Sequence, residues 1–477
     1  MSPAPARDDA DPTDPAAGAG SAAPAGPVAP RRGRAVGATV VLLGLTSLLT
    51  DLSTEMVTAV LPLYLVERLG FSPFQYGLVS GLYQGASAVG RLLSGVVSDR
   101  FHRHREVAAT GYAMSAAAKV VLAAGGASPA VLSGSLAADQ IGKGIRTAPR
   151  DAMLSLSAPA ARLGFVFGVH RVMDTVGAML GPFTAFALLA LSPGSYDLVF
   201  VFSACIGLVG VAVIVLLVRP PAAPAVTEPA SGTEPASGTE PASGTEPVSG
   251  TASAGAGPPP GTRASLAATA GLLRSAPYRR LALVAVGLAL CTVGDGFIYL
   301  RLVQQVELAG IYFPLLAAGV YCVYLLLALP LGQLADAVGR PWVFLGGYLA
   351  LSGVYVLLCS PRPGASGLVA VLVLLGAYYA ATDGVLAAAA SALVPASVRT
   401  GGLALVQTGV ALAQLAGSAV FGALWTWCGP EVAFRWAVLA GLIAVLLAVI
   451  ALRGGGVAGA AREDVAGAAE EGEEQRG

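Results

Sequence analysis

The feature that most constrains this chain is a series of about twelve apolar stretches, each near the ~20 residues that cross the hydrocarbon core of a membrane. Backbone amides in a bilayer must be hydrogen-bonded within their own segment, so we expect each stretch to be a helix. Only 12% of the residues are charged, against about 25% in soluble proteins. The expected helices cover residues 36–66, 73–98, 105–126, 128–149, 163–190, 196–219, 280–305, 311–335, 341–360, 366–395, 401–428 and 432–452.

The segments outside these stretches are rich in Ala, Pro, Gly, Ser and Thr, and one of them repeats TEPASG between Thr227 and Gly250. Such sequences bury too little apolar surface to fold, so we expect disorder there. The expected organisation is a disordered tail at 1–35, a six-helix bundle at 36–219, a disordered linker at 220–279, a second six-helix bundle at 280–453 and an acidic tail at 454–477.

Arginines gather before the first stretch, in alternate loops and around the linker, whereas the intervening loops carry little positive charge. Loops rich in Lys and Arg stay on the cytoplasmic side of a membrane. We therefore predict a multi-pass protein of the inner (plasma) membrane, with both termini and the linker cytoplasmic and the lipid bilayer as its main partner.

Several classes of function are excluded by composition and spacing. The 28 Lys plus Arg balance 28 Asp plus Glu, so no basic surface is offered to nucleic acid. The five cysteines lack the spacing of a metal site, although pairing of Cys359 with Cys428 is left open. A Gly-Lys-Gly at Gly142 lacks the rest of a nucleotide-binding loop, and no catalytic constellation is present. We expect no metal, no cofactor and no enzyme activity.

Two expected cytoplasmic loops, one in each bundle, resemble each other. Each combines small glycines, which let helices approach closely, with an acid beside arginine, which can hold neighbouring helix ends together. Duplication of this kind is typical of transporters built from internal repeats. We predict a conformational latch that holds the cytoplasmic side closed, formed by Gly95, Asp99, Arg100, Arg103, Gly332, Asp336, Gly339 and Arg340.

These loops resemble the signature of the major facilitator superfamily, Gly-x-x-x-Asp-Arg-x-x-Arg, and the resemblance extends over essentially every expected helix. It implies an all-α membrane protein with twelve transmembrane helices in two six-helix bundles, related by a pseudo-twofold axis, around a cavity that opens to alternate sides. The stretches GKGIRxxPRD at Gly142 and HRxMDT at His170 resemble a prokaryotic branch of the family.

The fifth expected helix contains a GxxxGP pattern formed by Gly177, Gly181 and Pro182. Close helix packing with a kink accounts for such a pattern in any membrane protein. Within the superfamily it resembles the antiporter motif, found mostly in proton-coupled exporters, and so favours efflux.

The fourth expected helix places an acid and three bases on one face, because Asp139, Lys143, Arg146 and Arg150 follow the i, i+4, i+7, i+11 spacing. A charge inside a bilayer costs at least a few kcal/mol, so this face is expected to turn towards protein or a wet cavity. The bases indicate a cargo that carries an anionic or zwitterionic group.

Other charged residues at membrane depth predict proton coupling. A low dielectric favours the protonated form of a carboxylate and a nearby cation opposes it, so a moving base can load or release a proton. For every such residue, a structural ion pair between helices is the alternative. Asp51 and Asp174 are the first candidates for the coupling acid, with Arg171 or Lys119 as the modulating cation. The predicted coupling set is Asp51, Glu55, Lys119, His170, Arg171 and Asp174.

A second set of residues is predicted to line the cavity, where tyrosines and glutamines supply aromatic faces and hydrogen bonds. Packing within the bundle or anchoring at the interface is the alternative for each tyrosine. The predicted lining is Asp139, Lys143, Arg146, Asp295, Tyr299, Tyr379, Asp383, Gln407 and Gln414, with Tyr83, Tyr324 and Tyr378 as further candidates.

The sequence thus predicts a secondary active transporter, acting as a monomer, that exports a small drug-like or metabolic molecule in exchange for protons. Proton-coupled uptake of an organic anion or nutrient is the first alternative, since it would use the same latch and cavity. A membrane receptor that does not transport is the second, and buried acids argue against it because a receptor needs no proton-titrating pair.

Overall fold

The structure is a computed structural model, and helices make up most of the described part of each expected membrane stretch. The described residues are 37–101, 104–125, 128–157, 163–218, 271–360, 364–383, 385–394 and 399–453. The predicted tails and almost all of the predicted linker lie outside these ranges.

The N-terminal half, residues 37–218, consists of long helices joined by short turns. Two of them end in π-helical turns, η1 (Tyr64–Arg68) and η3 (Val213–Leu217). The helices are α1 (Ala38–Leu63), α2 (Pro73–Phe101), α3 (His104–Ala124), α4 (Pro129–Leu156), α5 (Leu163–Leu191) and α6 (Tyr196–Ala212).

The C-terminal half, residues 271–453, repeats this plan with two interrupted helices. Short 3₁₀ turns, η4 (Leu272–Arg274) and η5 (Gly310–Tyr312), precede α8 and α10. The helices are α8 (Ala276–Leu290), α9 (Asp295–Val306), α10 (Phe313–Val338), α11 (Arg340–Cys359), α12 (Gly364–Thr382), α13 (Val385–Ala392), α14 (Arg399–Cys428) and α15 (Pro430–Arg453).

The boundaries differ from expectation at three places. The stretch 280–305 begins earlier, at Ala276, and is broken between α8 and α9, where the buried backbone N–H of Val293 donates to the Tyr355 hydroxyl at 2.8 Å. The stretch 366–395 is broken between α12 and α13. The fourth stretch continues through Pro149 to the end of α4 at Leu156, beyond the predicted residue 149.

The described helices have the length of membrane-spanning helices, and their outer faces are apolar. Ten helical segments are long and apolar enough to cross a bilayer, while α2 and α4 are equally long but more polar. Large apolar side chains remain exposed on the outer faces, among them Leu191 at 82% and Leu326 at 75%. Exposure on this scale marks a lipid-facing surface. Cys359 and Cys428 are free thiols.

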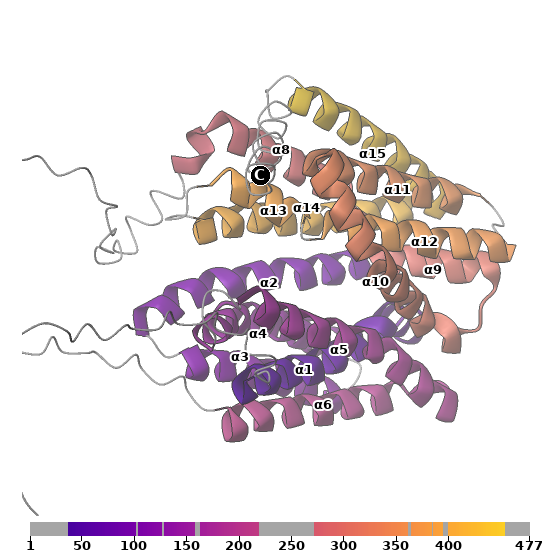
Figure 1. Cartoon of the computed structure of the whole chain (residues 1–477). Coiled ribbons are helices and arrows are strands. Elements are labelled where there is room, and N and C mark those ends of the chain that lie inside the picture. Colours follow the sequence, from indigo (N-terminus) through magenta and orange to yellow (C-terminus); the bar gives the residue numbers. More distant parts are fainter. Residues whose placement is uncertain are drawn as a thin grey trace, which may run out of the picture. The chain divides into compact units, whose positions relative to one another are not determined.

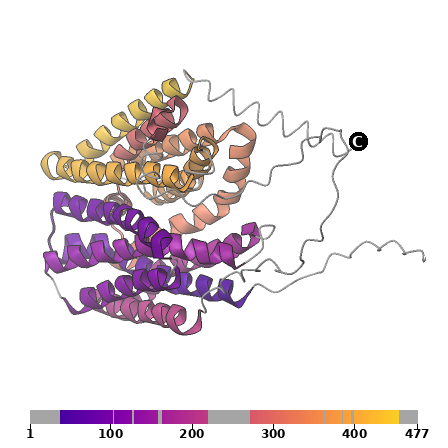
Figure 2. The ribbon, with the colours of Figure 1, turned by 90° about the vertical axis from the view of Figure 1, so that its left-hand side faces the viewer.

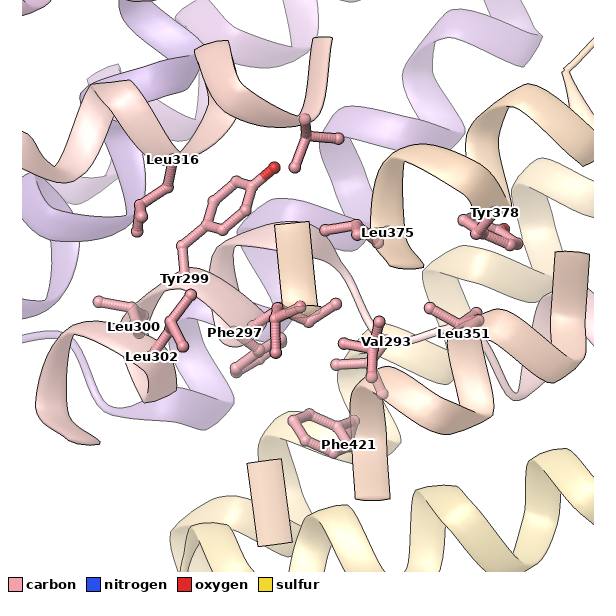
Figure 3. Packing of buried hydrophobic residues seen from close by; sticks show 14 of the residues in the cluster. Val293, Phe297, Tyr299, Leu300, Leu302, Leu316, Leu351, Leu375, Tyr378 and Phe421 are labelled. Carbon is pink, nitrogen blue, oxygen red and sulfur yellow. The ribbon is translucent and has the colours of Figure 1, made fainter. Parts of the chain in front are cut away.

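Each half packs mainly within itself. In the N-terminal half α1 lies against α5 and α6, and α4 lies against α2 and α3; in the C-terminal half α11 lies against α12 and α15. Figure 1 shows these two groups by colour, and Figure 2 shows the same grouping after a 90° turn. An aromatic core in the C-terminal half, including Phe297 and Phe421 with ring centroids 5.0 Å apart, fixes α9 against α14 (Figure 3).

The two halves touch chiefly where α2 packs on α14, and α5 and α1 also contact α10. A Cβ at Gly77 would lie 2.5 Å from the carbonyl oxygen of Ser418, and one at Gly81 would lie 2.8 Å from that of Leu415. Only a residue without a side chain permits this approach of two helix backbones. The glycines of α2 therefore set how closely the halves meet.

Candidate functional site

The charged face of α4 begins with a buried ion pair to α3. Lys119 Nζ lies 3.0 Å from Asp139 Oδ1, and both side chains are almost completely buried. The same ammonium group donates to Thr54 Oγ1 at 2.9 Å and to Ser115 Oγ at 3.1 Å. Ser115 in turn donates to Asp139. All three donors of the ammonium group are thereby used, which is the condition for burying a lysine.

The middle of the α4 face pairs with α1. Arg146, 1% exposed, donates to Asp51 Oδ1 at 2.8 Å and stacks on the Tyr112 ring at 4.6 Å from its centroid. Lys143 Nζ approaches the same carboxylate to 4.0 Å, and its side chain is 37% exposed. Among the described residues, Nε and one terminal nitrogen of Arg146 have no hydrogen-bond partner.

The end of the α4 face meets α5 and α1. Arg150 lies 3.8 Å from Asp174 Oδ1 and 3.0 Å from Asp151 Oδ1. Ser47 Oγ accepts from Arg150 at 3.1 Å and donates to Asp174 at 2.7 Å. The serine hydroxyl therefore bridges the arginine and the acid.

These contacts form what we call the charge ladder: Asp51, Lys119, Asp139, Lys143, Arg146, Arg150 and Asp174. It lies within the N-terminal half, and each of its bases has an acid of the protein as partner. Buried charges are tolerated when they are paired in this way. The bases that predicted an anionic cargo are thus largely occupied by carboxylates of α1, α4 and α5.

A different environment surrounds two further acids, Glu55 in the N-terminal half and Asp295 in the C-terminal half. Tyr321 of α10 donates to Glu55 Oε2 of α1 at 3.0 Å. The Tyr379 hydroxyl of α12 lies 2.7 Å from both oxygens of Asp295 of α9. Within the described part of the chain, neither Glu55 nor Asp295 forms an ion pair within 4.0 Å, although the charge of Lys143 acts on Glu55 from a longer distance.

A salt bridge also joins the halves. Arg171 of α5 lies 2.8 Å from Asp383 at the end of α12, and Tyr324 of α10 donates to the same carboxylate oxygen at 3.1 Å. The two charged side chains are 62% and 48% exposed. The contact therefore brings together a residue predicted for coupling and one predicted for the cavity.

The remaining predicted residues make fewer contacts with the charged clusters described above. His170 is 4% exposed and its Nε2 has no hydrogen-bond partner among the described residues. Tyr83 shares a 3.0 Å hydrogen bond with Thr58. Gln407 and Gln414 are partly buried on α14, and no side-chain hydrogen bond joins them to the clusters in the part of the chain that is described. Tyr378 packs against Tyr348 within the C-terminal core.

The GxxxGP glycines lie where α5 crosses α1. A Cβ at Gly177 would be 2.3 Å from the Leu48 carbonyl oxygen, and one at Gly181 would be 2.6 Å from Glu55 Cβ. The close approach allows α5 to bring Asp174 beside Ser47. The motif thus supports the charge ladder through packing.

Most side chains of the predicted latch lie outside the part of the chain that the structure describes. Arg103 is not among the described residues, and Gly95, Asp99, Arg100 and Asp336 are described only as parts of α2 and α10. Gly339 has φ 107° between α10 and α11, a conformation that favours glycine. A Cβ at Gly332 would meet no described atom within 4 Å, so close helix approach does not involve it here. Arg340 begins α11 and is exposed. The latch remains a prediction.

Several site residues escaped the sequence analysis, namely Ser47, Thr54, Tyr112, Ser115 and Tyr321. Ser47 and Ser115 each precede a predicted charged residue by one helical turn, and this i, i+4 spacing could have identified them. Tyr321 gives no such signal, because a tyrosine in an apolar helix is usually a packing residue.

Comparison with known proteins agrees with this fold. The sequence model of the Major Facilitator Superfamily matches residues 43–313 and 297–470. An uncharacterised MFS-type transporter of Methanocaldococcus jannaschii is 37% identical over 178 residues, which are 36% of this chain and 43% of that relative. The alignment therefore spans less than half of the relative's length.

Solved transporters share the architecture at low sequence identity. A mutant of the nucleoside transporter NupG superposes with a TM-score of 0.68 at 14% identity, over 87% of this chain and 99% of that one. A POT family transporter in complex with 5-aminolevulinic acid gives 0.66 at 12% identity, over 87% and 95%. The chain belongs to the Major Facilitator Superfamily.

Proposed function

We propose that this transporter exports a small organic molecule from the cell in exchange for protons. The observation that carries the proposal is the hydrogen bond between Glu55 of α1 and Tyr321 of α10. It joins a carboxylate that forms no ion pair within 4.0 Å in the described structure to the opposite half of the molecule. A proton on Glu55 would therefore act at a contact between the halves.

The physical link is the strength of that hydrogen bond. A hydrogen bond to an ionised carboxylate is roughly twice as strong as one between neutral groups. Protonation of Glu55 weakens the contact to Tyr321, and separation of the halves weakens the hold on the ionised form. Proton binding and conformational change are then coupled in both directions, as thermodynamic linkage requires.

The charge ladder has a supporting part in this proposal. Asp51 and Asp174, the first candidates of the sequence analysis, each face arginine. An arginine beside a carboxylate favours its ionised form, and the pair holds the neighbouring helices in place. We therefore move the coupling role to Glu55 and assign the ladder to holding α1, α3, α4 and α5 together as one rigid half.

The direction follows from the driving force. Protons flow inward across the cell membrane, so a carrier that exchanges protons for cargo moves the cargo outward. We also propose that both termini face the cytoplasm of the cell membrane and that the two halves of one chain suffice as a monomer.

The test uses the full chain in proteoliposomes with a pH-sensitive dye inside and a library of small cations, zwitterions and anions outside. Cargo entry should drive proton exit, and Glu55→Gln should reduce this proton movement at least tenfold. Glu106→Gln, at an exposed position of α3, is the matched control and should behave as wild type. Undiminished proton exchange in Glu55→Gln would remove Glu55 from the proposal.

Uptake of an organic anion together with protons is the second candidate. It is favoured by the partly exposed Lys143 and by the two nitrogens of Arg146 that have no hydrogen-bond partner among the described residues. An anion that drew Lys143 away from Asp51 would favour a proton on that acid, so anion and proton would bind together. Movement of both in the same direction in the dye assay would establish this candidate.

A further inference from the structure

We infer that a groove on the outer surface of the C-terminal half binds an acidic phospholipid, with its acyl chain in the groove and its phosphate beside Arg453. This lateral groove has a volume of about 290 Å³ and is formed by α10, α11 and α12. Its lining includes Leu331, Leu334, Val338, Trp342, Gly346 and Ala377. The inference is independent of the direction and the driving force proposed for transport.

The lateral groove opens on the apolar exterior of the molecule. Leu334 and Val338 are exposed at its edge, and Leu326 and Leu329 continue the exposed apolar surface along α10. An apolar surface of this kind on a membrane-spanning helix faces the tails of the lipids. The groove is therefore accessible to an acyl chain from the bilayer.

Two adjacent glycines of α11 give the lateral groove its shape. A Cβ at Gly347 would lie 2.9 Å from the Cβ of Ala381, so this glycine lets α11 pack closely on α12. A Cβ at Gly346 would meet no described atom within 4 Å. Packing among the described residues does not require a glycine at position 346, and the absence of a side chain there leaves the groove open.

The lining suits a hydrocarbon chain better than a cargo molecule. Sites for small molecules have volumes of ~300–1,000 Å³ and contain several polar groups that orient the ligand. The lateral groove is at the lower end of this range, and the indole N–H of Trp342 is the only polar side-chain group among its lining residues. An acyl chain requires only van der Waals contact, which such a lining supplies.

A cation lies at the end of the groove where α10 ends and α11 begins. The guanidinium group of Arg453, the last residue of α15, lies over the Trp342 ring at 5.8 Å from its centroid. This contact agrees with the packing of α15 beside α11 (Figure 1). Arg453 is exposed and forms no ion pair with another described residue. Positive charge is thus placed next to the mouth of an apolar groove.

The first turn of α11 adds two further features at the same end. Its N-cap is Gly339, which provides no side-chain hydrogen bond to the amides of that turn, and its first residue is the exposed Arg340. Helix N-termini carry a partial positive charge and attract phosphate. Tryptophan, as at position 342, is typical of the level of the lipid head groups. Both features favour a phosphate next to Arg453.

The positive charge selects the class of lipid. Acyl chains are the same in all classes, so the groove alone would not distinguish among them. A zwitterionic head group carries its own cation beside the phosphate, whereas an acidic phospholipid brings a net negative charge. Basic residues close to a membrane surface attract acidic lipids for this reason. The lateral groove and Arg453 together therefore form a site for one acidic phospholipid molecule.

The experiment uses Trp342 as a reporter of the lipid chain beside it. Bromine atoms on an acyl chain quench the fluorescence of a tryptophan that they contact. The full chain has four tryptophans, and replacement of Trp425, Trp427 and Trp436 by Phe leaves Trp342 alone. If loss of the buried Trp425 prevents folding, the difference between wild type and Trp342→Phe gives the same signal.

The protein is placed in phosphatidylcholine vesicles that contain a minor fraction of brominated phosphatidylglycerol or brominated phosphatidylcholine. Phosphatidylglycerol should reach Trp342 with about fivefold higher affinity, the factor that one arginine near a membrane surface supplies. Arg453→Gln should remove this preference because the charge is lost. Gly346→Leu should also remove it, because the new side chain fills the groove and excludes the chain.

The control variants are Arg279→Gln and Gly287→Leu. Arg279 is an exposed arginine near the start of α8, and a Cβ at Gly287 would meet no described atom within 4 Å. Both variants should retain the preference. Equal quenching by the two brominated lipids in the parent would overturn the inference. A preference that survives Gly346→Leu would show that the groove holds no chain, and one that is lost on addition of inorganic phosphate at constant ionic strength would show a site for a free anion.

Discussion

At the scale of the residue, the Lys119–Asp139 ion pair shows how this protein accommodates buried charges. Lys119 and Asp139 have no access to water, and each is stable only because the other is present. The same reasoning separates the acids of the molecule into two kinds. Those of the charge ladder have lysine or arginine as ion-pair partners, whereas Glu55 and Asp295 accept hydrogen bonds from tyrosine hydroxyls.

Removal of one member of this pair should be severely destabilising. Asp139→Ala leaves the Lys119 ammonium buried without its counter-charge, and we expect a loss of about 3–5 kcal/mol. The double variant Lys119→Met/Asp139→Leu removes both charges and should recover most of that loss. Thermal unfolding of the purified variants in detergent measures both effects. A double variant no more stable than Asp139→Ala would show that the pair does more than neutralise charge.

The positions of the helices along the chain could largely be predicted from the sequence. Which helices pack against one another could not. Apolar runs of membrane length revealed each stretch, but the breaks at Cys291 and Asp383 lie in runs that remain apolar on both sides. The i, i+4, i+7 spacing identified one charged face on α4. It could not reveal that Asp139 faces α3, Arg146 faces α1 and Arg150 faces α5, because those contacts depend on how distant segments pack.

The contact of α2 with α14 should control one side of the transport cycle. In Gly81→Val the new side chain would collide with the Leu415 backbone, so the halves could not close at this interface. Spin labels at Phe74→Cys and Trp427→Cys, in a chain without the native cysteines, should then report longer and broader distances than in the parent. Gly134→Val is the matched control, since a Cβ at Gly134 meets no described atom within 4 Å.

The salt bridge between Arg171 of α5 and Asp383 at the end of α12 also joins the halves, so it should affect the rate of transport. Arg171→Glu places two negative charges together and should lower the transport rate about fivefold. This factor corresponds to the ~1 kcal/mol that an exposed ion pair contributes. The exchanged pair Arg171→Glu/Asp383→Arg should restore the rate. If the exchanged pair is as impaired as the single variant, Arg171 acts through a partner other than Asp383.

At the scale of the whole molecule, the two halves are joined by a segment whose side of the membrane can be measured. We expect a cysteine introduced at Ser237 in the repeat region to react with an impermeant maleimide only after the membrane is opened. Arginine clusters around this segment are the physical reason, since such clusters remain on the cytoplasmic side. Labelling in intact cells would reverse the assigned topology.

The composition of the charge ladder has a consequence for voltage. A membrane potential of 100 mV acts on each elementary charge that crosses it with about 2.3 kcal/mol. The ladder holds four bases and three acids within one half, so its movement as a rigid unit carries a net charge of one through that field. Because the ladder returns to its starting place in every cycle, the net charge moved per cycle is that of the proton and the cargo. Exchange of one proton for a cargo with one positive charge is then electrically silent, and the pH difference alone determines the gradient against which the cargo is exported.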